Sequence, residues 1–230
     1  MNYIGSKLSL IPFIRAAVED CVGIDLSDRV FCDLFAGTGV VGRSFKSRVR
    51  KVISNDWEYY SYVLNRNYIG NHIALDSQDE LVRELNEMAG VDGGLIFQTY
   101  CYGSGSGRQY FSDENGKKID AIRIQIERWK NNGYISEDMY FFLLATLLES
   151  ADKLANTASV YGAFLKHLKA AAQKSLILEP AYFTTNSNKH EVYCEDANML
   201  IKDIQGDILY LDPPYNSRQY GANYHLLNTI

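Results

Sequence analysis

The sequence has 230 residues, of which 47% are hydrophobic and 22% are charged, an ordinary composition for a globular chain of one or two domains. The formal net charge of −5 excludes a protein that binds nucleic acid with its whole surface, although it leaves room for a local basic face. The four cysteines contain no CxxC pair and histidine is scarce, so we expect neither a metal site nor disulfide bonds. A reduced, cytoplasmic setting is the simplest interpretation.

Two hydrophobic segments bear on membrane targeting and insertion. The opening segment MNYIGSKLSLIPFIRAAVED has no long apolar core followed by a small-residue cleavage site, so it does not resemble a signal peptide. The longest mainly apolar run, residues 140–148, is too short to span a bilayer and predicts a buried helix. We therefore expect no association with a membrane.

The start of the chain alternates helix and strand patterns. Residues 7–21 place apolar side chains at the spacing of an amphipathic helix. Residues 30–34 predict a buried strand that runs into a glycine turn, and residues 51–56 predict a second short strand that ends in an acid. Residues 57–68 then look helical. This order of elements favours a parallel sheet.

The pattern changes after about residue 75. Residues 98–118 are rich in Gly, Ser, Asn and charged residues and predict a long loop. Helical patterns follow without intervening strands, and Ser136 is the expected N-cap of the second of them. The three expected helices cover residues 117–133, 136–156 and 159–175. We interpret residues 75–188 as a mainly helical insertion.

The α/β pattern resumes near residue 189. Residues 191–194 predict a third strand that ends at Glu195 and Asp196, and the run ILYL predicts a fourth strand directly before Asp212. The expected fold is therefore an α/β domain formed by residues 1–74 and 189–230, interrupted by the helical insertion.

A glycine-rich motif follows the first expected strand. In DLFAGTGVVG, the spacing Gly37-x-Gly39-x-x-Gly42 lets the backbone turn sharply and approach a ligand closely. Asp56, at the end of the second strand, could accept hydrogen bonds from ribose hydroxyls. These residues alone fit either a dinucleotide-dependent dehydrogenase or an S-adenosylmethionine-dependent methyltransferase. Asp33 favours the second class, because a carboxylate suits a cationic amino acid group and would repel a pyrophosphate.

The motif DPPY follows the fourth strand. The two prolines cannot continue a sheet ladder, so they end the strand and stiffen the backbone. Asp212 and the carbonyl of Pro213 then offer two hydrogen-bond acceptors beside the flat ring of Tyr215. Two acceptors and a ring suit a planar group with an exocyclic amino group, whose lone pair becomes available when both N–H groups are bound. Catalysis would rest mainly on orientation and electrostatic positioning.

The segments NYIGSK, DLFAGTGVVG, SNDWEYYS, CEDANML and LDPPYNSRQY occur in this order, and together they resemble the D12 class of N6-adenine DNA methyltransferases, the group of the Dam-type enzymes. The restriction–modification members that carry DPPYN-x-RQY are the most similar in motif. The resemblance implies a Rossmann-like sheet with an inserted target-recognition domain at residues 75–188. It also implies methyl transfer from S-adenosylmethionine to N6 of a flipped-out adenine in a specific sequence of double-stranded DNA.

The resemblance assigns roles to single residues. Asp212, Pro213 and Tyr215 match the motif that holds the target adenine. Asp56 matches the acid that binds the ribose, and Asp196 matches the acid that binds the cofactor's adenine. The remaining matches to cofactor motifs are Tyr3, Gly5, Ser6, Lys7, Asp33, Phe35, Gly37 and Gly39. For the segment NYIGSK taken alone, a helix cap at Ser6 would be the preferred interpretation.

Candidate DNA contacts lie in two regions. Arg218, Gln219 and Tyr220 follow the catalytic motif and could support a flipped base, although an ordinary polar loop is an equal alternative. The insertion contributes Arg108, Gln109, Arg123, Lys166 and Lys169. Arginine and glutamine suit the edges of guanine and adenine, but the recognition sequence cannot be predicted from them.

The sheet expected from this sequence has four strands, whereas the family implies further strands after the DPPY strand. We therefore expect that a partner chain or self-association completes the sheet, or that the chain is a truncated fragment. An unpaired sheet edge is prone to association.

Other functions stay open. The same chemistry could serve an adenine in RNA or a glutamine amide in a protein. A truncated or inactive remnant could bind only DNA or the cofactor. An NAD-dependent dehydrogenase would explain the glycine motif but not DPPY.

Overall fold

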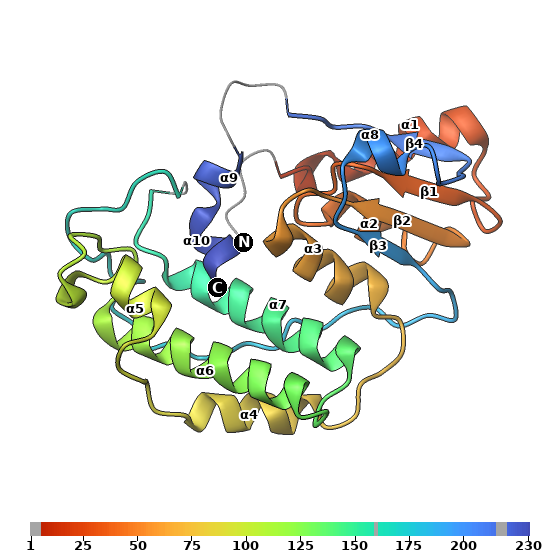
Figure 1. Cartoon of the computed structure of the whole chain (residues 1–230). Helices are drawn as coiled ribbons and strands as arrows, with labels where there is room; N and C mark the ends of the chain where they lie inside the picture. Colours follow the sequence, from red (N-terminus) through yellow and green to blue (C-terminus); the bar gives the residue numbers. More distant parts are fainter. Residues whose placement is uncertain (1–5, 159–160, 215–219) are drawn as a thin grey trace. The chain divides into compact units, whose positions relative to one another are not determined.

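The computed structural model describes residues 6–158, 161–214 and 220–230 (Figure 1). The chain divides into two compact units, each of which is described by itself. The sheet unit contains residues 6–74 and 182–214, and the helical unit contains residues 75–158, 161–181 and 220–230. Residues 182–188 thus belong to the sheet unit and residues 220–230 to the helical unit, which differs from the boundaries expected from sequence. The division into catalytic and target-recognition domains stays a prediction.

The sheet unit contains four short parallel strands in the order β3-β2-β1-β4 (Figure 1). Their bounds are Val30–Asp33 for β1, Lys51–Asn55 for β2, Glu191–Tyr193 for β3 and Ile208–Tyr210 for β4. Every residue of β1 is buried, as expected for an inner strand covered on both faces. The α/β fold with a parallel sheet that the sequence predicts is confirmed.

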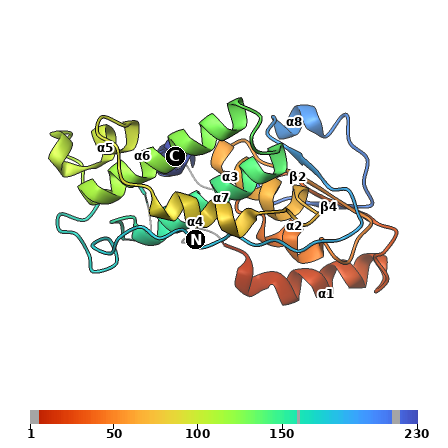
Figure 2. The same cartoon turned by 90° about the horizontal axis from the view of Figure 1, so that it is seen from below.

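One face of the sheet packs against two helices. Phe31, Val52 and Ile208 point to this face and form one apolar cluster with residues of α1 (Ile11–Val22) and α2 (Val40–Phe45). The rings of Phe31 and Phe45 stack with their centroids 4.3 Å apart. Figure 2 shows α1 and α8 (Ala197–Leu200) on opposite sides of the strands.

The second face is covered less completely. Val30, Cys32 and Ile53 form a small cluster there, which Ile204 partly covers. Leu209 pairs with Cys32 in the sheet but is 49% exposed, and Leu211, which follows β4, is 52% exposed. Within the described residues β4 pairs only with β1, so one edge of this strand is unpaired.

The helix expected over residues 57–68 is present but changes its winding. It begins as α3 (Tyr59–Asn65) and continues as one π-helical turn (Arg66–Gly70). This turn buries Ile69 in the apolar cluster of the first sheet face.

The helical unit is built around two long helices that pack against each other, α6 (Asp113–Asn131) and α7 (Glu137–Leu154). Ser112 and Ser136 are their N-caps, as the sequence predicts for Ser136. Each hydroxyl accepts a hydrogen bond from the backbone N–H of the residue three positions later in the chain. Two acids follow each cap and complement the helix dipole. The remaining α-helices of this unit are α4 (Gln78–Glu87), α5 (Leu95–Tyr100), α9 (Tyr220–Asn223) and α10 (His225–Thr229), and residues Tyr102–Ser104 form a short 3-10 helix.

Helix α7 is buried along most of its length, which confirms the buried helix predicted over residues 140–148. Among the residues that the structure describes, no helix is long and apolar enough to cross a membrane.

The prediction of a helix over residues 159–175 is wrong, because the described part of this segment consists of turns and irregular chain. The buried side chain of Asn156 provides the physical reason. It accepts a hydrogen bond from the backbone N–H of Lys169 and donates to the carbonyl oxygen of Leu165. These backbone groups would pair within the segment if it were helical.

Candidate active site

The carboxyl ends of the four parallel strands form one edge of the sheet unit. The chain moves from β1 to β2 and β3 on one side and returns to β4 on the other side of β1. The edge between β1 and β4 is therefore a topological switch point, where open α/β sheets bind their ligands. Asp33 ends β1 and Asp212 follows β4, so both acids lie at this edge.

Asp33 is almost fully buried and has an unusual environment. Neither of its carboxylate oxygens has a hydrogen-bond partner within the described residues. Burial raises the pKa of Asp33 to about 7, and the charges of Asp56 and Asp212 add to this effect. The backbone N–H groups of Phe35 and Gly42 oppose the rise, although neither completes a hydrogen bond. A buried acceptor without a donor is rare in folded proteins and indicates a position prepared for a ligand.

Asp56 lies beside the glycine turn that follows β1. Its Oδ2 accepts a hydrogen bond from the N–H of Gly37 at 2.7 Å, and its Oδ1 accepts from the N–H of Glu58 at 3.0 Å. Burial raises the pKa of Asp56. The carboxylate thus joins the end of β2 to the glycine turn.

The glycines of this turn are required by its geometry. Gly37 and Gly39 have φ values of 53° and 75°, which L side chains rarely adopt. A Cβ atom at Gly39 would lie 2.5 Å from Oδ1 of Asn65, and one at Gly42 would lie 2.8 Å from the Ile69 side chain. The first two glycines thus shape the turn, and the third allows close packing of α2.

Three buried polar residues that sequence reasoning missed hold this turn in place. The carbonyl oxygen of Gly37 accepts hydrogen bonds from the hydroxyl of Ser61 and from Nδ2 of Asn65. The hydroxyl of Ser54 donates to Oδ1 of Asn65 at 2.8 Å, which fixes the orientation of the amide. The i, i+4 spacing of Ser61 and Asn65, which places both on one face of α3, is the sequence pattern that could have identified them.

Asn55, at the end of β2, was also missed. Its Nδ2 donates to the carbonyl oxygens of Leu34 and Glu195, and its Oδ1 accepts from the N–H of Glu195. One buried amide therefore ties together the segments that follow β1 and β3.

The segment after β4 presents the predicted catalytic acid. Nζ of Lys7 lies 2.5 Å from Oδ2 of Asp212, and the side chains are 21% and 30% exposed. Pro213 is exposed. Tyr215 lies outside the described residues.

The other predicted cofactor residues are placed as follows. Ser6 accepts a hydrogen bond from the N–H of Leu8 at 3.5 Å, and Phe35 is half-buried. Asp196 is exposed and caps α8 by accepting from the N–H of Asn198. Tyr3 and Gly5 lie outside the described residues.

The residues of the insertion that were predicted to contact DNA differ in their exposure and in their hydrogen bonds within the protein. Arg108 and Lys166 are exposed, whereas Lys169 donates to the carbonyl oxygen of Thr157. Gln109 is half-buried, and its backbone carbonyl accepts from Asn156.

Arg123 is engaged inside the helical unit. It forms an ion pair with Glu127 and donates to the Tyr140 hydroxyl and the carbonyl oxygen of Ile230. Arg218, Gln219 and the side chain of Tyr220 lie outside the described residues. The roles of all these residues in DNA binding stay predictions.

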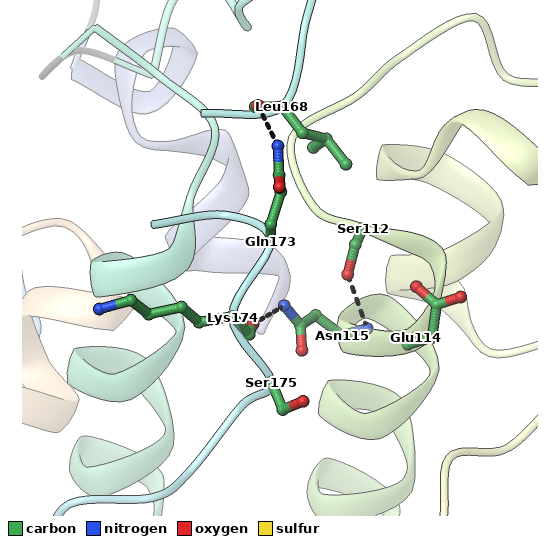
Figure 3. Close-up of a pocket in the computed structure, with 7 residues that line it drawn as sticks. All are labelled: Ser112, Glu114, Asn115, Leu168, Gln173, Lys174 and Ser175. Atoms are coloured by element: carbon green, nitrogen blue, oxygen red, sulfur yellow. Dashed lines mark hydrogen bonds between the residues drawn. The ribbon is translucent and has the colours of Figure 1, made fainter. Parts of the chain in front are cut away.

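The helical unit contains a pocket of about 310 Å³ between the start of α6 and the irregular segment before Leu176 (Figure 3). It includes none of the site residues predicted from sequence. Asn115 lines this pocket, and its Nδ2 donates a hydrogen bond to the carbonyl oxygen of Lys174 at 2.8 Å. The Lys174 side chain points away from Glu114 (Figure 3), so the segment is held by its backbone while its charge stays outside.

Comparisons with known proteins agree in pointing to one family. Residues 3–230 match the family model of the D12 class N6 adenine-specific DNA methyltransferases. The chain is 67% identical to the type II methyltransferase M.NlaIII of Neisseria lactamica, over the whole chain and 69% of that relative. It is 40% identical to M.CviAII of Paramecium bursaria Chlorella virus 1, over the whole chain and 68% of that relative.

A third relative, the type II methyltransferase M.FokI of Planomicrobium okeanokoites, is 40% identical over the whole chain, which spans 36% of that protein. No solved structure matched the chain. The family match covers almost every residue and includes residues of both units. The chain therefore belongs to the D12 class N6 adenine-specific DNA methyltransferases.

Proposed function

We propose that this adenine-specific DNA methyltransferase takes its methyl group from S-adenosylmethionine and modifies N6 of a flipped-out adenine in double-stranded DNA. The observation that carries the proposal is Asp33, a buried carboxylate without a hydrogen-bond partner in the described residues. It shares the carboxyl edge of the sheet with the glycine turn and with Asp212. The cofactor and the target base would therefore be bound side by side at this edge.

The chemistry of this edge fits S-adenosylmethionine better than a dinucleotide. The cofactor carries a cationic amino group that Asp33 can neutralise, whereas a pyrophosphate would be repelled. A buried carboxylate is costly until a cation or donor reaches it. We propose that Asp33 binds this amino group, and that Phe35, Gly37 and Gly39 form the surface along which the amino acid part lies.

The other acids retain acceptor capacity for the nucleoside part of the cofactor. Asp56 receives one N–H group on each oxygen and a further hydrogen bond from the side chain of Ser61, and a carboxylate with about four acceptor positions can still accept a ribose hydroxyl. Asp196 uses Oδ1 as a helix cap, so Oδ2 is available for the amino group of the cofactor's adenine. The contributions of Tyr3, Gly5 and Ser6 to the same site stay predictions.

When bound, S-adenosylmethionine supplies an electrophilic methyl group. On the protein side, Asp212 and the carbonyl oxygen of Pro213 accept hydrogen bonds from the amino group of the target adenine, and Tyr215 stacks against the base. These hydrogen bonds favour a pyramidal nitrogen with an available lone pair. That nitrogen would form its bond to the methyl carbon as the bond from this carbon to sulfur breaks, which leaves a neutral thioether, and it would then release one proton to water. The residues contribute orientation and electrostatics, and no strongly basic group is required.

We propose that the helical unit contacts DNA through a basic loop face, defined by Arg108, Lys166, Lys169 and Lys174. Residues 93–112 and 155–178 contain no acid, although the whole chain carries a net charge of −5. Asn156 joins the two stretches, because it bonds to backbone groups of Gln109, Leu165 and Lys169. The positive charges are therefore concentrated on two segments that are fixed to each other.

The basic loop face is suited to phosphate groups. Arg108, Lys166 and Lys174 are exposed, and within the described residues none of them forms an ion pair that would compete with a phosphate. Gln109 could add base contacts beside them. Arg123 is left out of the proposal, because its guanidinium is engaged by Glu127, Tyr140 and Ile230.

We propose a role in a restriction–modification system within the cytoplasm. The similar proteins M.NlaIII and M.FokI are named type II methyltransferases, and a further relative from Streptococcus sanguinis is named a modification methylase. The four cysteines are free thiols, as is usual in a reducing compartment.

We also propose that a partner chain or a second copy covers β4. Within the described residues this strand is paired on one side only, and Leu209 and Leu211 expose one face. Parallel sheets of this kind are normally covered on both faces. An apolar strand with a free edge is a ready template for association.

Asp33 makes cofactor binding depend on pH. We expect the affinity for S-adenosylmethionine, measured by calorimetry, to rise between pH 6 and pH 8 as Asp33 loses its proton, by at most about tenfold per pH unit. Asp33→Asn should weaken binding and flatten this dependence. Asp203→Asn, which changes an exposed acid of the same unit, serves as the control. Equal affinity of the Asp33→Asn variant and the parent would contradict the assignment.

Asp33→Asn should weaken cofactor binding but stabilise the ligand-free protein. The folded pKa of Asp33 is about 7, against about 3.9 in an unfolded chain. The folded state therefore binds the proton of Asp33 more tightly than the unfolded chain does. The resulting contribution to the free energy of unfolding is fully present below about pH 4 and is lost as the pH rises towards 7. Asp33→Asn should remove that loss and raise the melting temperature at pH 8.

The basic loop face should control the salt dependence of DNA binding. We expect the triple variant Arg108→Ala, Lys166→Ala, Lys174→Ala to reduce the slope of log K against log salt by about 0.9 for each phosphate that is no longer neutralised. The control triple Arg83→Ala, Arg128→Ala, Lys153→Ala removes the same charge from other parts of the helical unit. An equal reduction in the control would mean that net charge, and not this face, governs binding.

The exposed face of β4 should drive association. Analytical ultracentrifugation of the chain should show a concentration-dependent dimer or larger species, and Leu209→Lys with Leu211→Lys should shift it towards the monomer. Ile73→Lys, at a similarly exposed apolar residue of the sheet unit, is the control. A parent chain that stays monomeric at high concentration would disprove self-association through β4.

A further inference from the structure

The ion pair between Lys7 and Asp212 joins two segments that are far apart in the sequence. Nζ of Lys7 lies 2.5 Å from Oδ2 of Asp212. Both residues belong to the sheet unit, and both were expected to act in the site, but in different roles. The sequence resemblance assigns Lys7 to the cofactor, whereas the structure pairs it with the acid that receives the target adenine.

Three other ion pairs of the sheet unit lie elsewhere. Arg29 and Asp207 precede β1 and β4, and Lys51 and Glu191 begin β2 and β3, so both pairs lie at the amino ends of the strands. The fourth pair joins Glu19 of α1 to Arg48. Of these four ion pairs, only that of Lys7 lies at the carboxyl edge.

That edge has a strong excess of negative charge. Asp33, Asp56 and Asp212 are close enough for Asp56 and Asp212 to disfavour ionisation of Asp33. A carboxylate that must act only as an acceptor is useful in its ionised form, because a protonated carboxyl also donates. Lys7 places a positive charge beside Asp212, next to this group of acids.

We propose that Lys7 is a positioning residue for Asp212. Its ammonium group occupies Oδ2, so the carboxylate is held in one orientation, and Oδ1 is left to accept a hydrogen bond from the adenine amino group. This inference rests on the proposed function of Asp212. It changes the role of Lys7 from a contact of the cofactor to a support of the target-base site.

The geometry of the pair makes this support effective. Pro213 and Pro214 restrict the backbone directly after Asp212, so the main remaining freedom of the residue is rotation of its side chain. The ion pair limits that rotation at a site that is only partly exposed. A hydrogen bond to a reacting amino group becomes much less effective when the acceptor is misplaced.

The test separates the two roles of Lys7 by measuring cofactor binding and turnover independently. In Lys7→Met we expect kcat to fall by about tenfold to a hundredfold at saturating cofactor and DNA. The Kd for S-adenosylmethionine, measured by calorimetry, should stay within about threefold of that of the parent. Lys7→Arg should recover much of the original kcat, because it retains a cation that can pair with Asp212.

Lys51→Met is the matched control. It breaks an ion pair of the same 2.5 Å length and similar exposure at the opposite ends of the strands, so it should leave both kcat and Kd near the parent values. A large rise in Kd with an unchanged kcat in Lys7→Met would overturn the inference and restore the role in cofactor binding. An equal reduction of kcat in Lys51→Met would overturn it as well, because that reduction would reflect general destabilisation.

A double-mutant cycle tests the pair without relying on activity. Lys7→Met should lower the melting temperature in the parent background but have no effect in the Asp212→Asn background. Equal shifts in both backgrounds would show that the two residues are not coupled. If the parent transferred no methyl group while the cycle showed coupling, the proposed function would fail and the ion pair would stand.

Discussion

The crowding of carboxylates at one edge of a small parallel sheet is the constraint on which the site depends. Parallel pairing brings the carboxyl ends of β1, β2 and β4 together, and each of these ends carries an acid. Burial and the neighbouring charges oppose ionisation of Asp33 and raise its pKa, and burial raises the pKa of Asp56 as well. The edge is therefore costly in the ligand-free protein and complementary to a positively charged ligand, which is how a site can store part of its binding free energy in the fold.

The glycine turn gives this electrostatic pattern a defined shape. Its backbone adopts conformations that require glycine, and it is held by side chains from both neighbouring elements, Ser54 from β2 and Ser61 and Asn65 from α3. Asp56 completes the arrangement by binding the N–H of Gly37. Because these groups are buried and bonded to one another, the turn is set before a ligand arrives, and little ordering is needed on binding.

Local patterns in the sequence predicted much of the sheet unit. Strands β1, β2 and β4 lie on short apolar runs that lead to an acid, and the glycine spacing located the turn after β1. The long helices α6 and α7 followed from apolar periodicity, and the cap at Ser136 located the start of α7. The start of α6 was missed, because residues 98–118 were expected to form a loop, whereas Ser112 caps this helix. The segment 159–175 was misjudged because Asn156 binds its backbone groups from outside, which no local pattern reveals. The same reason hid Asn65 and the partner of Lys7, since their contacts join distant parts of the chain.

The chemical identity of the methylated product tests the central claim most directly. Incubation with labelled S-adenosylmethionine and equal masses of duplex DNA, RNA and unmodified protein should place the label in DNA alone. Digestion to nucleosides should recover it as N6-methyldeoxyadenosine, and Asp212→Asn should abolish this signal. Label in RNA, in protein or on another base, or full activity of Asp212→Asn, would contradict the claim.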